Sequence, residues 1–266
     1  MSETSRHDAW QAGDSYEQYM GRWSRQIAPL FLEWLGAPPN ADWLEVGCGT
    51  GALTANILSL CEPNSIVAVE PSAGFLEKAR ANVSDPRVQF HTADAQDLDV
   101  PSCSKDIIVS GLVLNFVPDR KKALSEMKRI VHPGGTLGFY VWDYPGGGVE
   151  FMRAFWKAAT SLDPAASNLT EDRRFPFCTP DRLRTLIEES GWTQVDSTAL
   201  EAPSVFRNFD DYWRPFTLGA GPAPGYCASL LPDARERLRD RLAATLPRQA
   251  DGSIRLMTRA WAIKAR

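Results

Sequence analysis

Short apolar runs alternate with longer segments of helical periodicity across the first half of this 266-residue chain. Buried parallel strands appear in a sequence as continuous hydrophobic runs, whereas the connecting helices show apolar residues three or four positions apart. The runs predicted as strands are 41–46, 65–70, 87–91, 105–110 and 136–142. This alternation predicts an α/β fold in which a doubly wound, mostly parallel sheet carries helices on both faces.

The second half of the chain continues the alternation less regularly. Helices are predicted at 149–162 and 181–190, and strands at 192–200 and 253–264. A further amphipathic helix is predicted from four apolar positions spaced four apart, which are Ala234, Leu238, Leu242 and Leu246. Residues 202–230, in which proline and glycine gather toward the end, are predicted to form a lid segment.

A helix that packs on the sheet is predicted before the first strand. Its apolar positions recur at helical spacing and are Ile27, Leu30, Phe31, Trp34 and Leu35. The segment Tyr-Glu-Gln-Tyr-Met-Gly-Arg-Trp-Ser precedes them at 16–24. Tyr16 and Trp23 fit both a packing face and a surface that faces a ligand, and both interpretations stay open.

A glycine-rich turn follows the first predicted strand, in the sequence Leu-Glu-Val-Gly-Cys-Gly-Thr-Gly at 44–51. Because glycine has no Cβ, the turn can be tight, and a ligand can approach the N–H groups at the start of the next helix. Gly47, Gly49 and Ala52 also satisfy the dinucleotide pattern G-x-G-x-x-G/A, while the lack of Gly-Lys-Ser/Thr excludes a P-loop. The turn therefore predicts a nucleotide-like ligand at the carboxyl end of the first strand.

Acidic residues accompany the first three predicted strands. Glu45 lies two residues before the first glycine and offers a carboxylate to a ligand that carries an amino group. Glu70 follows the glycines by roughly 20 residues, where a carboxylate can accept both ribose hydroxyls. Asp94-Ala95 comes just after the third strand. A dinucleotide-dependent dehydrogenase shares the glycine turn and Glu70, but accounts for neither Asp94-Ala95 nor the long C-terminal continuation.

Five motifs follow one another in order over about residues 40–142, which is roughly half of the chain. They are the glycine turn at 45–51, Val-Glu-Pro-Ser at 69–72, Ala-Asp-Ala at 93–95, Gly-Leu-Val-Leu-Asn-Phe at 111–116 and Arg-Ile-Val-His-Pro-Gly-Gly at 129–135. In this order and spacing the chain resembles the class I S-adenosylmethionine-dependent methyltransferases, in the small-molecule group similar to the ubiquinone/menaquinone-biosynthesis enzymes. The resemblance implies a Rossmann-like seven-stranded sheet with an antiparallel last strand, an inserted helical cap and S-adenosylmethionine as the cofactor.

The resemblance also implies a set of cofactor-binding residues. They are Tyr19, Arg22, Glu45, Gly47, Cys48, Gly49, Gly51, Glu70, Pro71, Phe75, Asp94, Ala95, Gly111 and Leu112. In this scheme the glycine turn, with Gly111 and Leu112, lies at the methionine part of the cofactor, where Glu45 holds the amino group directly or through water. Glu70 accepts the ribose hydroxyls and Phe75 covers one adenine face. Asp94 accepts from the adenine amino group, beside the Ala95 N–H.

The N-terminal segment resembles a helix that closes over the cofactor in related enzymes with a Tyr…Gly-Arg-Trp-Ser pattern. Tyr19 and Arg22 are therefore expected to reach the methionine carboxylate. Cys48 is expected to be a small residue of the turn and not a nucleophile. The expected organisation is a lid at 1–36, a cofactor-binding core at 37–144, a cap with the sixth strand and acceptor-pocket elements at 145–230, and a C-terminal helix and last strand at 231–266.

Residues after the fourth and fifth predicted strands are expected to contact the methyl acceptor. They are Asn115, Trp142, Asp143 and Tyr144. No catalytic residue is assigned, since an enzyme that works by positioning alone needs no general base. The cap is rich in Phe and Trp, most of which we expect to be ordinary core, and a subset facing the cofactor favours an apolar or aromatic acceptor.

Composition narrows the function classes further. A net charge of −4 and a pI near 5.5 give no electrostatic support for a nucleic-acid partner. No apolar stretch is long enough to span a membrane, and no signal peptide is recognised, so we expect a cytoplasmic protein. The five cysteines are widely spaced, so neither a metal site nor a disulfide framework is indicated.

Two classes of function stay open from the sequence. One is a methyltransferase that acts on a small molecule by in-line displacement; the other is a non-catalytic protein of the same fold that binds S-adenosylmethionine or S-adenosylhomocysteine. The intact set of Glu45, Glu70 and Asp94 argues against decay of the cofactor site. The sequence specifies neither the acceptor and the atom methylated nor the oligomeric state.

Overall fold

The computed structural model describes residues 17–219 and 221–266, and the chain divides into two compact units. One unit comprises Ser24–Trp142, Phe177–Leu200 and Ala260–Arg266, and we name it the sheet unit. The other comprises Asp143–Pro176 and Glu201–Arg259 with the described part of Met1–Trp23, and we name it the helical unit.

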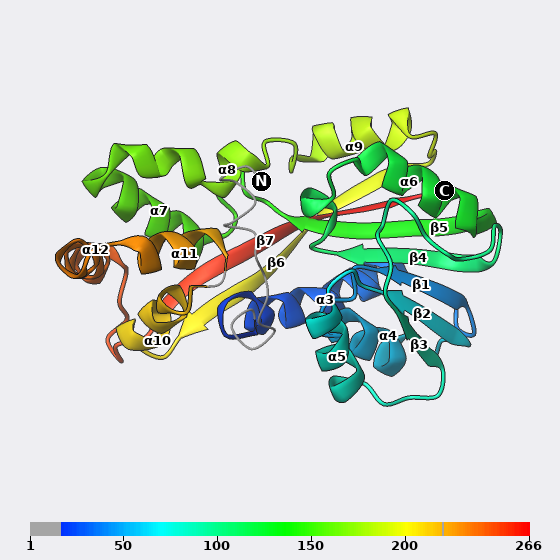
Figure 1. The fold of residues 1–266 in the computed structure, drawn as a ribbon, viewed down its shortest axis with the longest axis horizontal. Helices are drawn as coiled ribbons and strands as arrows, with labels where there is room; N and C mark the ends of the chain where they lie inside the picture. The colour runs from blue at the N-terminus through cyan, green and yellow to red at the C-terminus, as the bar shows by residue number, and fades with distance from the viewer. Residues whose placement is uncertain (1–16, 220) are drawn as a thin grey trace. The chain divides into compact units, whose positions relative to one another are not determined.

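Seven strands form one sheet of order β3-β2-β1-β4-β5-β7-β6 (Figure 1). The strands are β1 (Asp42–Val46), β2 (Ser65–Val69), β3 (Val88–His91), β4 (Lys105–Gly111), β5 (Val131–Trp142), β6 (Asp196–Phe206) and β7 (Ile254–Ala265). β1 is parallel to β2 and β4, β2 to β3, and β4 to β5, whereas β7 is antiparallel to β5. The predicted fold class is confirmed, including the antiparallel last strand.

Five described helices of the sheet unit accompany the strands. They are α3 (Arg22–Leu35), α4 (Ala52–Leu60), α5 (Ala73–Asn82), α6 (Arg120–Ile130) and α9 (Pro180–Glu189), with the short turn η2 (Leu114–Phe116). Of these, α4, α5 and α6 connect parallel strands. Consecutive residues Trp43 and Leu44 of β1 are both 0% exposed, as are Ile108 and Val109 of β4. Such burial of both strand faces explains why these segments read as continuous apolar runs.

The predicted packing of α3 on the sheet is confirmed for most of its apolar face. Ile27 and Phe31 are fully buried, and the Phe31 ring lies 4.8 Å from that of Tyr140 in β5. Leu30 was expected in the same stripe, but this prediction is wrong because Leu30 is 36% exposed. With 3.6 residues per turn, Leu30 falls at the edge of the stripe that Phe31 and Leu35 occupy.

The boundaries of β6 differ from the prediction at both ends. Trp192 lies before the strand, where its indole Nε1 donates to the Leu124 carbonyl at 3.3 Å. The strand continues to Phe206, so the first residues of the predicted lid are strand instead. Burial alternates along this part of β6, where Leu200 and Ala202 are buried and their neighbours are exposed. This period-2 pattern favours a strand, and the proline within it is tolerated because β6 is the edge strand.

The fifth strand begins before the predicted start at Thr136. β5 already pairs at Val131 with Lys105, and its register with β4 then shifts between Lys105 and Ile107. The extra residues of β5 at this shift include Gly134, whose φ of 82° is a conformation that favours glycine. The His-Pro-Gly-Gly part of the motif at 129–135 is therefore an irregularity within β5.

Eight short or medium helical segments belong to the described part of the helical unit. They are η1 (Glu17–Gly21), α7 (Glu150–Leu162), η3 (Pro164–Leu169), α8 (Glu171–Arg174), α10 (Phe209–Trp213), η4 (Arg214–Thr217), α11 (Pro222–Ser229) and α12 (Pro232–Thr245). Leu238 and Leu242 are buried, which confirms the amphipathic helix. Most aromatic residues singled out in the cap are buried as core, and Phe177, which belongs to the sheet unit, is half-buried.

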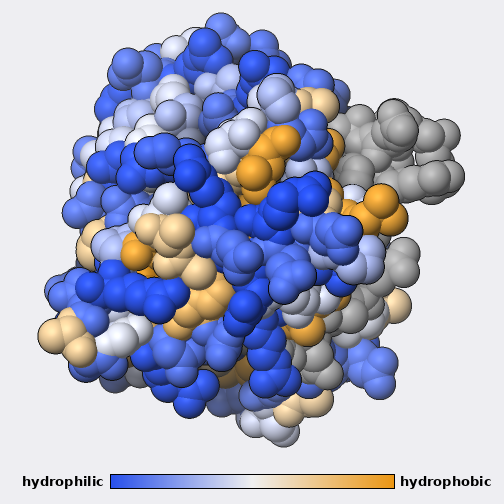
Figure 2. All heavy atoms as spheres, turned by 90° about the vertical axis from the view of Figure 1, so that its left-hand side faces the viewer, coloured by the Kyte–Doolittle hydropathy of each residue, from blue (hydrophilic) through white to orange (hydrophobic). Residues whose placement is uncertain are grey.

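The side that carries α12 in Figure 1 is drawn as a surface in Figure 2. It is mostly hydrophilic, with small separate hydrophobic patches. Polar residues on the exposed face of α12, such as Arg237 and Asp240, fit this surface. Within residues 17–219 and 221–266, no helix combines the length and the hydropathy that a membrane span requires.

Candidate functional site

The carboxyl ends of four neighbouring strands bring together most of the predicted cofactor-binding residues. β3, β2, β1 and β4 are adjacent and parallel, so the residues that follow each strand lie along one edge of the sheet. Glu45 is in β1, Glu70 directly follows β2, Asp94 comes after β3, and Gly111 ends β4. This edge is where open α/β sheets bind ligands.

The glycine turn at this edge is held by backbone hydrogen bonds and leaves one face open. The N–H groups of Gly47 and Cys48 both donate to the Val69 carbonyl, at 2.8 and 3.0 Å. Gly47, Gly49 and Gly51 have φ values of 78°, 54° and 86°. A Cβ on Gly47 would lie 2.5 Å from a Val113 methyl carbon, whereas a Cβ on Gly49 would meet no atom within 4 Å. The open space beside Gly49 is a cradle that a side chain would fill.

Glu70 fastens the glycine turn to the end of β2. Its Oε2 accepts from the Gly49 N–H at 3.1 Å, and its Oε1 accepts from the Ser72 N–H at 3.0 Å. The side chain is buried, and burial raises its pKa against the opposing effect of these two N–H donors. Each carboxylate oxygen keeps acceptor capacity, so this oriented group can receive further hydroxyl donors.

Glu45 is buried in β1 and has a partner that the sequence analysis missed. The Thr54 hydroxyl, from the first turn of α4, donates to Glu45 Oε2 at 2.5 Å. Burial raises the pKa of Glu45 to about 8, although the Thr54 hydrogen bond opposes this shift. The sequence signal for this partner was a hydroxyl residue, Thr54, in the first helical turn after the glycines. A cationic group placed beside Glu45 would favour its ionised form.

Asp94 is exposed and is oriented by Gln96, a residue that sequence reasoning also missed. Asp94 Oδ1 accepts from the Gln96 N–H at 2.8 Å and from its side-chain Nε2 at 2.9 Å. These hydrogen bonds lower the pKa of Asp94. Gln96 Oε1 accepts in turn from the Asp119 N–H, and Ala95 is buried beside it. Asp94 is thus an ionised acceptor at the end of β3.

The end of β4 has a strained turn and an unsatisfied donor. Leu112 has a φ of 63°, and its N–H donates to the Tyr140 carbonyl at 2.8 Å. A Cβ on Gly111 would lie 2.6 Å from the Tyr140 hydroxyl oxygen, so a larger residue there would displace the Tyr140 side chain. Asn115 is 4% exposed, and its Nδ2 has no hydrogen-bond partner among the residues that the structure describes. A buried amide donor without a partner costs free energy unless a ligand or water satisfies it.

Comparisons with known proteins agree with this geometry. A family profile described as a methyltransferase domain matches residues 44–139. The chain is 30% identical over 192 residues to a malonyl-[acyl-carrier protein] O-methyltransferase of Brevibacillus brevis, covering 68% of this chain and 66% of that protein. It is 32% identical over 131 residues to a trans-aconitate 2-methyltransferase of Deinococcus radiodurans, covering 48% of each.

The fold is shared with a solved methyltransferase. A phosphoethanolamine N-methyltransferase 2 of Haemonchus contortus, in complex with S-adenosylmethionine, matches with a TM-score of 0.60 at 16% identity, over 100% of this chain and 60% of that one. Residues 44–139 of this chain thus match the methyltransferase domain family. The resemblance found in the sequence is confirmed. The chain spans less than two thirds of the length of the two curated relatives, 66% and 48%.

Two further predicted cofactor residues, Tyr19 and Arg22, lie in the helical unit. Tyr19 is buried, with its ring 5.4 Å from Phe216. The Arg22 guanidinium contacts both carboxylate oxygens of Asp211, at 3.1 and 3.3 Å, and lies 4.3 Å over the Trp23 ring. Their contact with the cofactor stays a prediction. Tyr16 lies outside the described residues.

The remaining predicted cofactor positions are a cysteine, a proline and an aromatic residue. Cys48 is buried, and burial raises the pKa of its thiol, which fits a small turn residue and not a nucleophile. Pro71 is exposed just after Glu70, and Phe75 is half-buried in the first turn of α5, which Ser72 caps by accepting from the Phe75 N–H.

The predicted acceptor residues are divided between the two units. Asn115 and Trp142 belong to the sheet unit, and Asp143 and Tyr144 to the helical unit. Asp143 is 1% exposed, and its Oδ2 lies 2.6 Å from Arg259 Nη2 and 2.8 Å from Arg259 Nε. Its Oδ1 accepts from the Gly146 N–H at 2.9 Å. Asp143 is therefore engaged in a structural ion pair. Among the described residues, no cluster of His, Cys, Asp and Glu fits a metal ion.

The methyltransferase domain should lose stability at high pH through Glu45. Because burial raises the pKa of Glu45 from 4.5 to about 8, the folded chain holds this proton where the unfolded chain has released it. Stability therefore falls as the pH rises from the unfolded-state pKa toward the folded one. Between these values wild type should lose about 4 kcal/mol relative to Glu45→Gln, measured by urea unfolding.

The control for this experiment is Glu77→Gln, at an exposed position of α5. Its difference from wild type should not change with pH. A difference between wild type and Glu45→Gln that is constant from about pH 5 to about pH 8 would contradict the buried, proton-binding state of Glu45.

Proposed function

We propose that this chain transfers a methyl group from S-adenosylmethionine to a small-molecule acceptor. The observation that carries the proposal is the open cradle at Gly49, fastened by Glu70 and flanked by Glu45 and Asp94 at one edge of the sheet. The names of the two curated relatives cite malonyl-[acyl-carrier protein], an acyl group carried on a protein, and trans-aconitate, and the second of these fits an acceptor of low molecular mass.

The residues present fit the chemical groups of S-adenosylmethionine. Glu45 would hold the amino group, because its buried carboxyl gains most from a cationic partner. Glu70 would accept the ribose hydroxyls, and Asp94 the adenine amino group. The open face of Gly49 and the N–H groups at the start of α4, which no side chain caps, would lie against the methionine part. When bound, the cofactor supplies a methyl group on a positively charged sulfur.

The chain's own contribution to such a transfer is positioning and exclusion of water. Asn115 is the acceptor-side group that the structure supports best, because its buried Nδ2 is an unused donor. Asp143 is held by Arg259, whose guanidinium occupies its Oδ2. We assign no general base in the sheet unit.

We also propose that the protein acts in the cytoplasm. All five cysteines, at positions 48, 61, 103, 178 and 227, are free thiols. Free thiols at widely separated positions fit a reducing compartment.

The test is the release of S-adenosylhomocysteine by the purified chain when it is offered a library of small acceptors. Calorimetry on the same preparation measures the affinity for S-adenosylmethionine. Turnover with at least one acceptor is expected. Tight binding without turnover on any acceptor would support the non-catalytic alternative, and absence of binding would refute the proposed pocket.

Asp94→Ala should weaken S-adenosylmethionine binding about tenfold, because a charged hydrogen-bond acceptor for the adenine is lost. Thermal stability should change little, since Asp94 is exposed. Asp99→Ala is the matched control, because Asp99 is also exposed and lies five positions further along the same loop. Equal affinities of the two variants, measured by calorimetry, would exclude Asp94 from the adenine site.

A further inference from the structure

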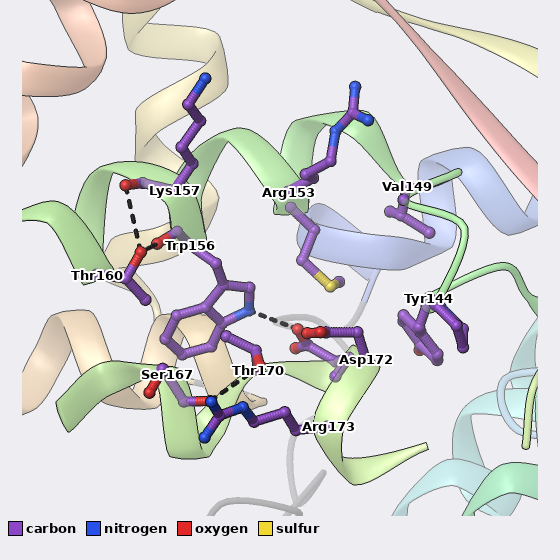
Figure 3. A pocket seen from close by; sticks show the side chains of 14 residues that line it. Tyr144, Val149, Arg153, Trp156, Lys157, Thr160, Ser167, Thr170, Asp172 and Arg173 are labelled. Carbon is purple, nitrogen blue, oxygen red and sulfur yellow. Dashed lines mark hydrogen bonds between the residues drawn. The ribbon is translucent and has the colours of Figure 1, made fainter. Parts of the chain in front are cut away.

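The helical unit holds a cavity of about 410 Å³, within the size range of small-molecule sites. It is formed by the loop before α7, by α7 itself, by η3 and by α8 (Figure 3). All the residues that line it belong to this unit, so the site is complete without residues of the sheet unit.

The floor of the cavity carries a buried carboxyl group with an unused oxygen. Glu171 opens α8 and is 4% exposed. The Trp156 indole N–H donates to Glu171 Oε2, and the dashed line from the indole nitrogen in Figure 3 marks this bond. Glu171 Oε1 has no hydrogen-bond partner among the described residues. A buried carboxyl oxygen without a donor is costly, so a donor supplied by a ligand would stabilise it.

The pKa of Glu171 is consistent with a buried carboxyl group whose Oε1 lacks a donor among the described residues. Burial raises the pKa of Glu171 to about 7, against the lowering effects of the Trp156 hydrogen bond and the Arg174 charge. Near neutral pH the group is therefore partly protonated. A neutral hydroxyl is a suitable donor to it, since a hydroxyl can also accept when Glu171 is protonated.

The walls of the cavity are flat and apolar. The Trp156 indole and the Tyr144 ring line it together with the Met152 side chain. The Tyr144 ring is fixed 5.5 Å from that of Phe175. Aromatic and thioether surfaces of this kind favour an aromatic ring in the bound molecule.

The rim of the cavity is positively charged. Arg153, Lys157 and Arg173 line it and are exposed, and the exposed acid among the lining residues is Asp172. In Figure 3 Arg153 and Lys157 extend from α7, while Arg173 comes from the α8 side. Arg153 is partly neutralised by Glu150 at 3.2 Å, so Lys157 and Arg173 supply most of the net charge. The rim therefore favours a molecule with an anionic group.

We infer that this cavity binds an aromatic hydroxy acid, with its hydroxyl on Glu171, its ring against Trp156 and Tyr144, and its carboxylate at the cationic rim. The binding site itself is defined by the helical unit alone.

The test is calorimetry with 3-(4-hydroxyphenyl)propionate and two analogues that each lack one group. 3-Phenylpropionate lacks the hydroxyl, and 4-ethylphenol lacks the carboxylate. Wild type should bind the complete probe more tightly than either analogue. Glu171→Gln should weaken the complete probe about tenfold and leave 3-phenylpropionate unchanged. Arg173→Gln should weaken both acids and leave 4-ethylphenol unchanged.

Two controls separate this inference from a folding defect and from the proposed function. Glu236→Gln, at an exposed position of α12, should bind all three probes like wild type. S-adenosylmethionine binding, measured on the same preparations, should be normal in every variant. No binding of the complete probe by a wild-type protein that binds S-adenosylmethionine would overturn the inference while leaving the proposed function intact. Equal loss of both acids in Glu171→Gln would also overturn it.

Discussion

Gly49→Val should lower the affinity for S-adenosylmethionine at least a hundredfold and abolish S-adenosylhomocysteine release at ordinary cofactor concentrations. Gly49 is the one glycine of the 47–51 turn whose Cβ direction is empty, with no atom within 4 Å. A valine side chain would occupy the space in which the cofactor is proposed to lie. The same substitution at Gly47 or Gly51 would instead meet Val113 or Val83 and disturb the fold.

The expected loss has a second cause in the same residue. The Gly49 N–H donates to Glu70 at 3.1 Å, and its φ of 54° is disfavoured for a β-branched residue. Any shift of this backbone would also release the carboxylate proposed to hold the ribose. Calorimetry with S-adenosylmethionine measures the loss, and thermal unfolding shows how much of it is general destabilisation.

Gly134→Val is the matched control for backbone strain. Gly134 also has a positive φ, 82°, and also has no atom within 4 Å of an added Cβ, but it lies in β5 at the register shift. The two variants should lose similar stability, on the order of 1–2 kcal/mol. Normal cofactor binding by Gly49→Val, or an equal loss of binding in Gly134→Val, would refute the cradle.

The sheet could be predicted from sequence because each of its parallel strands carries a local signal. Buried strands such as β1 and β4 are continuous apolar runs, and the carboxyl end of each is marked by glycine or an acid. The order of these ends along one edge of the sheet follows from the parallel topology. Glu45, Glu70 and Asp94 could therefore be expected at one edge before any coordinates were known.

Side-chain partners could not be predicted in the same way, because they depend on contacts between segments distant in sequence. Asp143 was a reasonable acceptor-side candidate from its position after β5. Its actual partner, Arg259, is 116 residues away, and no local pattern announces the pair. Likewise, Glu171 attracted no notice in the sequence, since only the fold buries it against Trp156.

The predicted end of β6 was wrong for a different reason. Proline and glycine after position 202 suggested a loop, yet the period-2 burial of Leu200, Ala202 and Phe206 continues the strand. Edge strands tolerate proline because the missing N–H faces no neighbour. The prediction gave more weight to the turn-forming residues than to the alternation of apolar and polar positions, and the structure follows the alternation.

Arg259→Ala should destabilise the protein by about 3 kcal/mol, the largest loss of stability expected from one surface-accessible charge. Asp143 is 2% exposed at its side chain, and Arg259 supplies two contacts to its Oδ2, at 2.6 and 2.8 Å. Removing the guanidinium leaves a buried carboxylate with the Gly146 N–H as its main remaining donor. Arg259 is itself 32% exposed, which places the effect at the lower end of the range for buried pairs.

Arg153→Ala is the contrasting control in the same unit, because its ion pair with Glu150 is 60% exposed on the arginine side and should contribute less than about 0.5 kcal/mol. Urea unfolding of both variants measures the difference.

The double variant Asp143→Ala/Arg259→Ala should be less destabilised than the sum of the single variants, since no charge is then left buried alone. Additive losses would mean that Asp143 and Arg259 are not coupled, and that the β7 residue acts through packing instead. Coupling at this pair would instead show that Arg259 of β7 holds the loop after β5 in place. Residues of this loop, among them Tyr144 and Gly147, line the cavity of the helical unit.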